Sequence, residues 1–151
     1  MKRLLVLLVS GLLLASTAFS QGKIGTPVEA EAMVKKAISF YKASGKDKAL
    51  AEISNQKGKF IDNDLYVFVY DMKGVCVAHG GNPKMIGKEL IDMKDADNKA
   101  FVQERVAIIK AKGKGWQNYK WSNPVSKRIE NKTAYIEKFD DLIFGCGAYK
   151  K

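Results

Sequence analysis

Residues 65–70, with the sequence LYVFVY, show the strongest alternation of side-chain type in the chain. In an extended strand the aliphatic side chains of Leu65, Val67 and Val69 would lie on one face, and three aromatic side chains on the other. Both faces are apolar enough to be covered by other elements. The pattern therefore predicts the central strand of a sheet.

A β-hairpin is predicted from this strand onward. Residues 71–74 can form a short turn, because Gly74 tolerates positive φ, and residues 75–78 are apolar enough to return as a second strand. His79, the only histidine of the chain, comes next. The strand cannot continue through residues 80–83, since two glycines loosen the backbone and a proline lacks an amide donor. The histidine is therefore predicted where the sheet gives way to a loop.

Helical spacing precedes the hairpin. Residues 26–44 carry an apolar stripe, and Thr26 with Glu29 three residues later has the pattern of a capping box at a helix start. Gly45 is predicted to end this long helix. Asp47 is predicted to cap a shorter helix that repeats the stripe.

A third helix is predicted after residues 94–97. Apolar residues recur at helical spacing within residues 101–109, and Gly113 would stop the helix. Either Asp95 or Asp97 can cap its first turn. Capping explains one of these two aspartates, so the other is a candidate for a different role.

The remaining chain alternates again. Residues 116–121, 129–139 and 142–149 are predicted as three further strands, joined by turns at residues 122–124 and 140–141. No repeat or low-complexity segment interrupts this order. The complete pattern predicts a five-stranded antiparallel sheet with a long N-terminal helix and helices on one face, which is an α+β domain.

Residues 1–20 have the composition of a secretory signal peptide. Residues 2–3 are basic, residues 4–14 form an apolar core, and residues 18–20 form a small-x-small cleavage site. Cleavage would leave residues 21–151 as a single domain exported to the periplasm. The alternative is an uncleaved segment that anchors the domain in the inner membrane.

The chain is basic, with a formal charge of +10 that falls to +8 if the two basic residues of the signal segment are removed. Nucleic acid, an anionic membrane and small acids are all compatible with such a surplus. The lysines are scattered, however, and lack the clustered arginines and interleaved aromatic residues of a nucleic-acid surface. We therefore predict a solvated basic surface and no nucleic-acid partner.

Catalysis and cofactors are not expected from the motifs. The chain has no CxxCH sequence for haem and no cluster of residues for a structural zinc ion. A Cys-His nucleophile pair is disfavoured, because Cys76 and His79 lie three apart and should point to opposite faces of a strand. Cys146 lies between two glycines, which offer no base. We therefore predict a protein without a cofactor that is not an enzyme.

Four segments of the chain resemble the single Cache domain of type 2, an extracytoplasmic sensor module with a PAS-like sheet. They are YVFVYDMKGVCVAHGGNPKMIGKEL, KDADNKAF, GKGWQNYKWSNP and NKTAYIEKFDDLIFGCGAY, in this order within residues 24–149. The resemblance implies a PAS-like form of the α+β fold with a long first helix. It also implies a role in sensing, as in signal transduction and chemotaxis.

The ligand class also follows from the resemblance. It implies a small organic acid of the acetate, propionate, lactate or pyruvate class, or a small neutral amide such as urea. Receptors of this family carry a second membrane span and a cytoplasmic region, which are not expected here because the chain stops soon after the last predicted strand. We therefore expect a stand-alone domain that either presents its ligand to a separate membrane receptor or sequesters the ligand. A ligand-free interaction module is the alternative, and a homodimer through the N-terminal helix is left open.

Six residues form the predicted ligand-binding set, because a small-ligand pocket needs apolar walls and a few convergent polar groups. Tyr119 and Trp121 would form the walls, and Lys132 would donate a charge-assisted hydrogen bond to a carboxylate. The resemblance places a ligand-facing carboxylate at Asp95, which leaves Asp97 as the helix cap. The full set is His79, Asp95, Tyr119, Trp121, Lys132 and Tyr135.

The same residues also have structural interpretations. The aromatic members of the set could be half-buried strand residues, and Lys132 could extend to solvent. His79 could end the strand and bond only a neighbouring carbonyl.

Two cysteines in an exported chain invite a disulfide. The strand order implied by the resemblance places the strands of Cys76 and Cys146 on opposite sides of the central strand. Two strand spacings are about 9 to 10 Å, whereas a disulfide needs Cα atoms within about 7 Å. We therefore predict two free, buried thiols.

Overall fold

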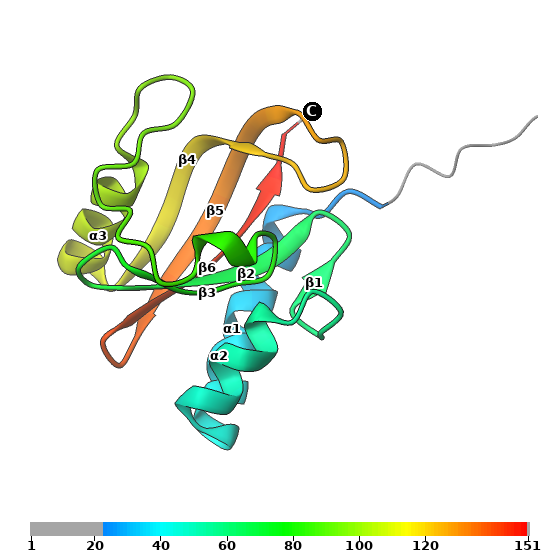
Figure 1. Ribbon diagram of the computed structural model, residues 1–151, viewed down its shortest axis with the longest axis vertical. Helices are drawn as coiled ribbons and strands as arrows, with labels where there is room; N and C mark the ends of the chain where they lie inside the picture. Colours follow the sequence, from blue (N-terminus) through cyan, green and yellow to red (C-terminus); the bar gives the residue numbers. More distant parts are fainter. Residues whose placement is uncertain (1–22, 151) are drawn as a thin grey trace, which may run out of the picture.

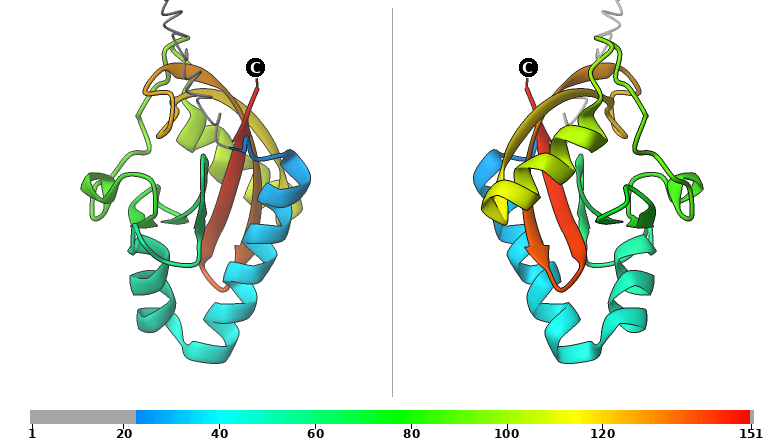
Figure 2. Two further views of the ribbon diagram at one scale, coloured as in Figure 1. Left: turned by 90° about the vertical axis from the view of Figure 1, so that its right-hand side faces the viewer. Right: turned by 90° about the vertical axis from the view of Figure 1, so that its left-hand side faces the viewer.

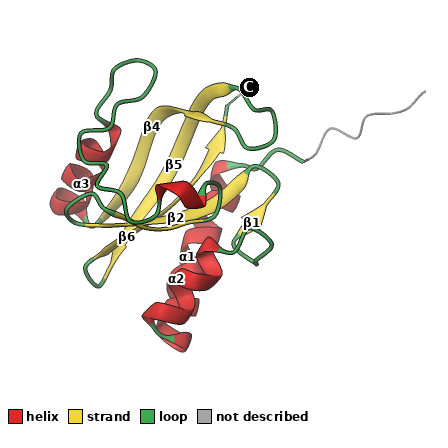
Figure 3. Cartoon of the chain, viewed as in Figure 1, coloured by secondary structure: helices red, strands yellow, loops and turns green. Residues whose placement is uncertain are grey.

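Six strands form one antiparallel sheet (Figures 1 and 3). The computed structural model describes residues 23–150, so the predicted signal segment lies outside the described residues. The strands are β1 (Ile61–Asp62), β2 (Leu65–Asp71), β3 (Cys76–His79), β4 (Lys114–Ser122), β5 (Ile129–Phe139) and β6 (Leu142–Tyr149). Their order is β1-β2-β6-β5-β4, with β3 also paired to β2. The five predicted strands are confirmed, and β1 is an additional strand that is too short to show a periodicity.

The helices begin close to their predicted positions. They are α1 (Pro27–Ser44), α2 (Lys46–Ser54), α3 (Phe101–Lys112) and the 3-10 helix η1 (Pro83–Met85). The predicted capping box at the start of α1 is confirmed: Glu29 N donates to Thr26 Oγ1 at 3.3 Å, and Thr26 N donates to Glu29 Oε2 at 2.9 Å. The prediction that Asp47 caps α2 is wrong. Gly45, with φ of 83°, ends α1 and also precedes α2, so Asp47 already lies inside the first turn.

The two faces of the sheet are covered by different helices (Figure 2). One face of β2, including Leu65 and Val67, packs in a cluster with α1 and α2. The other face, including Tyr66 and Phe68, packs in a cluster with α3 and Met85 of η1. The expectation of helices on one face is therefore correct for α1 and α2 and wrong for α3. We call the two sides the α1 face and the α3 face.

A β-bulge changes the direction of the side chains in β3. Tyr70 pairs with Cys76 and Val69 with Ala78, so Val77 is an extra residue without a partner. The extra residue reverses the alternation. Cys76 and the ring of His79 therefore both lie on the α3 face, and the prediction of opposite faces is wrong.

The cysteines lie on the two strands that flank β2. Cys76 belongs to β3 and Cys146 to β6, as the predicted strand order requires, and both are free and buried. Burial raises the pKa of Cys76 to about 11 and that of Cys146 to about 12. Both thiols are therefore protonated at neutral pH and are weak nucleophiles.

None of the helices within residues 23–150 is both long and apolar enough to cross a membrane.

Candidate functional site

Lys132 is a buried lysine in the middle of the sheet. It belongs to β5, where it pairs with Tyr119 of β4 on one side and with Tyr149 of β6 on the other. Strand alternation puts it on the α3 face together with Ala134 and Ile136. Only 1% of the residue is exposed, so the interpretation that its side chain extends to solvent is wrong.

Aromatic rings surround the ammonium group of Lys132. Its Nζ lies 3.8 Å from the centroid of the Tyr66 ring and 4.7 Å from that of Tyr149. Among residues 23–150, no carboxylate oxygen lies within 4.0 Å of this nitrogen. Burial, together with the charge of Arg105, lowers the pKa of Lys132 to about 7. An ammonium without an acidic partner in an aromatic setting is suited to bind an anion from outside the chain.

Two tyrosine hydroxyls connect Lys132 to the backbone. Tyr149 Oη donates to the carbonyl of Ser122 at 2.8 Å and accepts from Lys132 Nζ at 3.4 Å. The hydroxyl of Tyr66 lies 3.3 Å from the same oxygen. Because Tyr149 uses its only hydrogen on Ser122, its lone pairs can hold both neighbours in place.

His79 adds a neutral donor to this face. Its ring lies 5.1 Å from that of Tyr66 and 6.2 Å from that of Phe68, and its Nδ1 accepts from Asn82 N at 2.9 Å. Burial and the charges of Lys132 and Arg105 lower the pKa of His79 to about 3. The imidazole is therefore neutral at pH 7, with its hydrogen on Nε2. Within the described part of the chain, Nε2 makes no hydrogen bond, and it bonds no neighbouring carbonyl.

Tyr119 and Trp121, which were predicted as pocket walls, both lie on the α3 face. The Tyr119 ring stacks on Phe101 of α3 at 4.9 Å with an interplanar angle of 3°, and Trp121 lies edge-on to the same ring at 5.4 Å. Tyr119 is buried and Trp121 is half-buried. Phe101 of α3 therefore packs on the rings of both strand residues and holds them in place.

Asp95 binds backbone amides of its own loop and of β4. Its Oδ1 accepts from Asp97 N at 2.9 Å and from Lys99 N at 3.0 Å, and its Oδ2 accepts from Lys120 N at 2.9 Å. Burial opposes ionisation, but these three backbone hydrogen bonds outweigh it and lower the pKa of Asp95. The carboxylate therefore fastens the loop before α3 to the edge of the sheet.

The prediction that Asp97 caps α3 is wrong. The residue before the helix is Ala100, which makes no side-chain cap, and Asp97 instead pairs with Lys120 Nζ at 2.8 Å. The loop formed around Asp95 places Asp97 too early in the chain to reach the first turn.

Tyr135 lies apart from the other predicted residues. It packs on the α1 face, its hydroxyl donates to Glu137 at 2.7 Å, and its ring lies edge-on to Trp116. Lys132 is on the opposite face of the same strand, three residues away. The prediction that both residues contact one ligand is therefore wrong.

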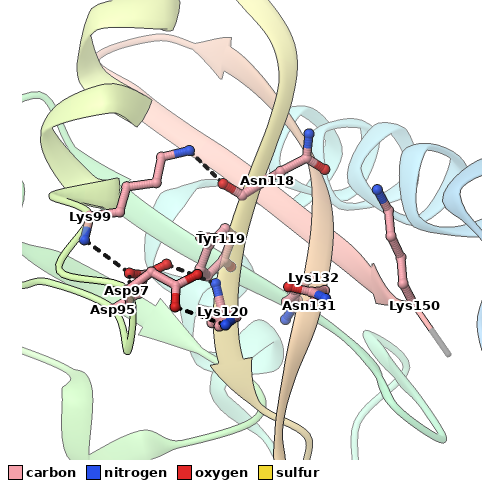
Figure 4. Close-up of a pocket in the computed structure, with 9 residues that line it drawn as sticks. All are labelled: Asp95, Asp97, Lys99, Asn118, Tyr119, Lys120, Asn131, Lys132 and Lys150. Carbon is pink, nitrogen blue, oxygen red and sulfur yellow. Dashed lines mark hydrogen bonds and ion pairs between the residues drawn. The ribbon is translucent and has the colours of Figure 1, made fainter.

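A pocket of about 260 Å³ lies over the ends of β4, β5 and β6, and Figure 4 shows the residues that line it. It is lined by Asp95, Asp97, Lys99, Asn118, Tyr119, Lys120, Asn131, Lys132 and Lys150. Lys99 pairs with Glu104 and Lys120 with Asp97, whereas Lys132 and Lys150 have no such partner within the described residues. The pocket unites three predicted residues, Asp95, Tyr119 and Lys132, and it is predominantly basic.

A second pocket, of about 180 Å³, opens next to the hydroxyl network. It is lined by Tyr66, Gly81, Asn82, Trp121, Ser122, Asn123, Pro124 and Lys127. Tyr66 covers Lys132, Ser122 accepts from Tyr149, and Asn82 bonds the ring of His79. This pocket therefore approaches the buried lysine from the side of the His79 loop.

Three residues of the site were not predicted from the sequence: Tyr66, Arg105 and Tyr149. Arg105 is 1% exposed and occupies the apolar stripe of α3, four residues after Phe101. A charged residue inside an apolar helical stripe is the signal that could have identified it. Strand alternation also puts Tyr66 on the face of Phe68, but alternation alone does not identify its neighbours across the sheet.

A metal centre has no support in the described residues. Within residues 23–150, no group of three or more His, Cys, Asp or Glu side chains is arranged to hold a metal ion. Around Lys132 the groups that can still bind a ligand are instead donors: its ammonium and the neutral imidazole of His79.

Known proteins with similar sequences and structures are sensors. The chain is 32% identical over 90 residues to the methyl-accepting chemotaxis protein McpP of Pseudomonas putida. The aligned region covers 58% of this chain and 16% of that protein. A methyl-accepting chemotaxis protein from Vibrio parahaemolyticus has 26% identity and a TM-score of 0.68, covering 81% of this chain and 86% of the solved one. The chain thus spans a small part of the chemotaxis protein from P. putida.

A solved Cache chemosensory domain, described for its recognition of carboxylic acids, is 28% identical. The similarity covers 80% of this chain and 86% of that domain, with a TM-score of 0.64. Residues 1–151 match the family described as single Cache domain 2. The α+β sheet, the long first helix and these matches agree, and the chain belongs to the single Cache domain 2 family.

Proposed function

We propose that this Cache domain binds a small organic carboxylate through the ammonium group of Lys132. The main support is that Lys132 is 1% exposed and that no carboxylate oxygen of residues 23–150 lies within 4.0 Å of its Nζ. A buried charge without a partner is costly, and a ligand carboxylate would supply the missing partner.

Neighbouring groups support an anionic ligand. The Nε2–H of His79 can donate to a carboxylate, and Tyr119 and Trp121 supply apolar contact. Asp95 does not contribute a direct contact in this proposal, because its oxygens already accept three amide hydrogens. The likeness to a Cache domain that recognises carboxylic acids points to the same ligand class.

The cellular role that we propose is sensing outside the cytoplasm. Cache domains are extracytoplasmic sensor domains, and we propose that residues 1–20 direct export and that the liganded domain contacts a membrane receptor. We propose no catalytic step, because the similar proteins are sensors and burial keeps both thiols protonated.

A thermal-shift screen of the purified protein tests the ligand proposal. The panel contains short mono- and dicarboxylates, amino acids and urea. A ligand at about 100 times its Kd should add roughly 2.7 kcal/mol to the free energy of unfolding and raise Tm by several degrees.

Two variants separate specific binding from general salt effects. Lys132→Met should abolish the shift, since the side chain keeps its length and loses its charge. Lys138→Met removes an exposed lysine of the same strand and should leave the shift unchanged. No shift across the whole panel, or the same shift in Lys132→Met, would contradict the proposal.

A further inference from the structure

Arg105 brings a second buried positive charge to the α3 face. It is 1% exposed, and its Cζ lies 4.3 Å from the centroid of the Phe68 ring and 4.7 Å from that of Tyr70. Within the described residues, no carboxylate oxygen lies within 4.0 Å of its nitrogens. The aromatic rings offset part of the cost of burying this charge but supply no anion.

The guanidinium is oriented through Gln117. Arg105 Nε donates to Gln117 Oε1 at 3.2 Å, and Gln117 Nε2 donates to Glu104 Oε2 at 2.7 Å and to the carbonyl of Phe101. These bonds fix both ends of the Gln117 amide. The guanidinium also lies within hydrogen-bonding reach of the hydroxyls of Tyr70 and Tyr119. Both hydroxyls are uncharged, so Arg105 still lacks an anion, and a planar, two-oxygen acceptor would suit its Nη groups better.

Arg105 and Lys132 lie close to each other on this face. The centroid of the Phe68 ring is 4.3 Å from Arg105 Cζ and 5.8 Å from Lys132 Nζ, so the two charges are separated by no more than about 10 Å. The buried carboxylate of Asp64 does not pair with either cation within 4.0 Å, and its Oδ1 accepts from Gly25 N at 2.8 Å. The face therefore presents two cations without an ion-pair partner.

We propose that Arg105 determines ligand specificity and that the ligand is a dicarboxylate of three or four carbons. One carboxylate binds Lys132 and the other binds the Nη groups of Arg105. Charge-assisted contacts occupy about 2.8 Å at each end, so a separation of at most about 10 Å leaves room only for a short chain between the carboxylates. This inference rests on the proposed function, because it uses Lys132 as the first anion-binding group.

Calorimetry on the unaltered protein tests the second charge directly. Succinate and succinamate have nearly the same shape, but succinamate has an amide in place of one carboxylate. Succinate should bind on the order of tenfold more tightly or better, since it alone forms a second charge-assisted contact. Malonate should bind comparably to succinate, and adipate should bind much more weakly because its chain is too long.

Substitution of the arginine provides the matched test. In Arg105→Met, succinate and succinamate should bind with equal affinity, while binding through Lys132 persists. Arg128→Met, which removes an exposed arginine, should keep the preference of the wild type. Circular dichroism and thermal unfolding establish that each variant is folded, and the succinate comparison on the wild type holds even if Arg105→Met does not fold.

The outcomes separate this inference from the proposed function. If monocarboxylates bind in a Lys132-dependent manner but succinate binds no more tightly than succinamate, the role of Arg105 is wrong and the carboxylate function stands. If no carboxylate binds at all, both are wrong. A preference for succinate that persists in a folded Arg105→Met variant also overturns the assignment.

Discussion

At the scale of single residues, the site depends on charges that are buried without acidic partners. Lys132 and Arg105 are each 1% exposed, and burial brings the pKa of Lys132 to about 7. Lys132 therefore titrates in the physiological range, whereas an exposed lysine would stay charged. His79 does not titrate there, because burial lowers its pKa to about 3.

Carboxylate affinity should depend on pH through Lys132. Below pH 7 the ammonium is charged and attracts the anion, and above pH 7 the free protein loses this charge. Affinity should therefore fall by up to tenfold per pH unit above about pH 7. Calorimetry between pH 6 and 9 measures this dependence, and proton uptake on binding at pH 8 appears as a dependence of the heat on the buffer.

The control for this prediction keeps a positive charge at all pH values. Folded Lys132→Arg should bind with little change between pH 6 and 9, because a guanidinium does not deprotonate in this range. A wild-type affinity that is constant over the same range would contradict the low pKa of Lys132 in the free protein.

At the scale of elements, loops and caps hold the sheet and helices around the site. The loop before α3 is fixed to β4 by the three amide hydrogen bonds to Asp95. The long helix α1 is fixed at its start by the capping box of Thr26 and Glu29. Neither feature belongs to the aromatic rings around Lys132. The contribution of each one to the stability of the fold can therefore be measured separately.

Replacement of Asp95 by asparagine should destabilise the fold more than it weakens binding. In the wild type, three backbone amides donate to the carboxylate of Asp95. The asparagine would offer them a neutral oxygen or an amide nitrogen instead, and we expect the free energy of unfolding to fall by about 1 to 3 kcal/mol. Chemical denaturation measures the loss. Asp97→Asn is the matched control, and it should cost less than about 1 kcal/mol because its ion pair with Lys120 is exposed. Equal losses in the two variants would contradict the role assigned to Asp95.

The capping box should contribute to stability in the same assay. Thr26→Ala removes the oxygen that accepts from Glu29 N and should lower the free energy of unfolding by about 1 kcal/mol. Ser39→Ala, at an exposed interior position of α1, should be neutral or slightly stabilising, since alanine is the better helix former. A neutral Thr26→Ala would show that the cap has no energetic role in the whole domain.

At the scale of the whole molecule, binding and stability are in opposition. The sheet and α3 enclose two cations that an apolar core would exclude, and this costs free energy as long as no anion is bound. Proteins commonly keep such unfavourable groups where function requires them.

Lys132→Met should therefore stabilise the unliganded protein while it abolishes binding. We expect a gain of about 1 kcal/mol or more at pH 6, where the wild-type lysine is charged in both the folded and the unfolded state. The pKa of Lys132 is about 7 in the folded state against 10.5 for the ordinary side chain. The folded wild type thus binds fewer protons between these values, and its free energy of unfolding should rise toward that of the variant as pH increases from 7 to 10.

Urea denaturation at pH 6 and pH 9.5 measures both effects. The difference between Lys132→Met and the wild type should be larger at pH 6. A variant that is less stable than the unliganded wild type at pH 6 would contradict the view that the buried ammonium lacks a partner.

Local sequence patterns predicted most of the fold because strands and caps depend on near neighbours. The alternation of residues 65–70 placed the central strand, and the capping box placed the start of α1. The errors came from features that need distant contacts. The bulge at Val77 is defined by its partner strand, and α3 covers the second face because apolar side chains on that face of β2 require burial.

For the site, the sequence by itself determined the chemical types available and the face of Lys132, because strand periodicity fixes the direction of a side chain. Only the tertiary structure decided which groups meet. It brought Arg105 from α3 and Tyr149 from β6 to the face of Lys132, and it left Tyr135 on the other side. It also decided that Asp95 binds backbone amides. The physical reason is that burial and hydrogen-bond partners, which set the charge and the role of a polar group, depend on residues far apart in the chain.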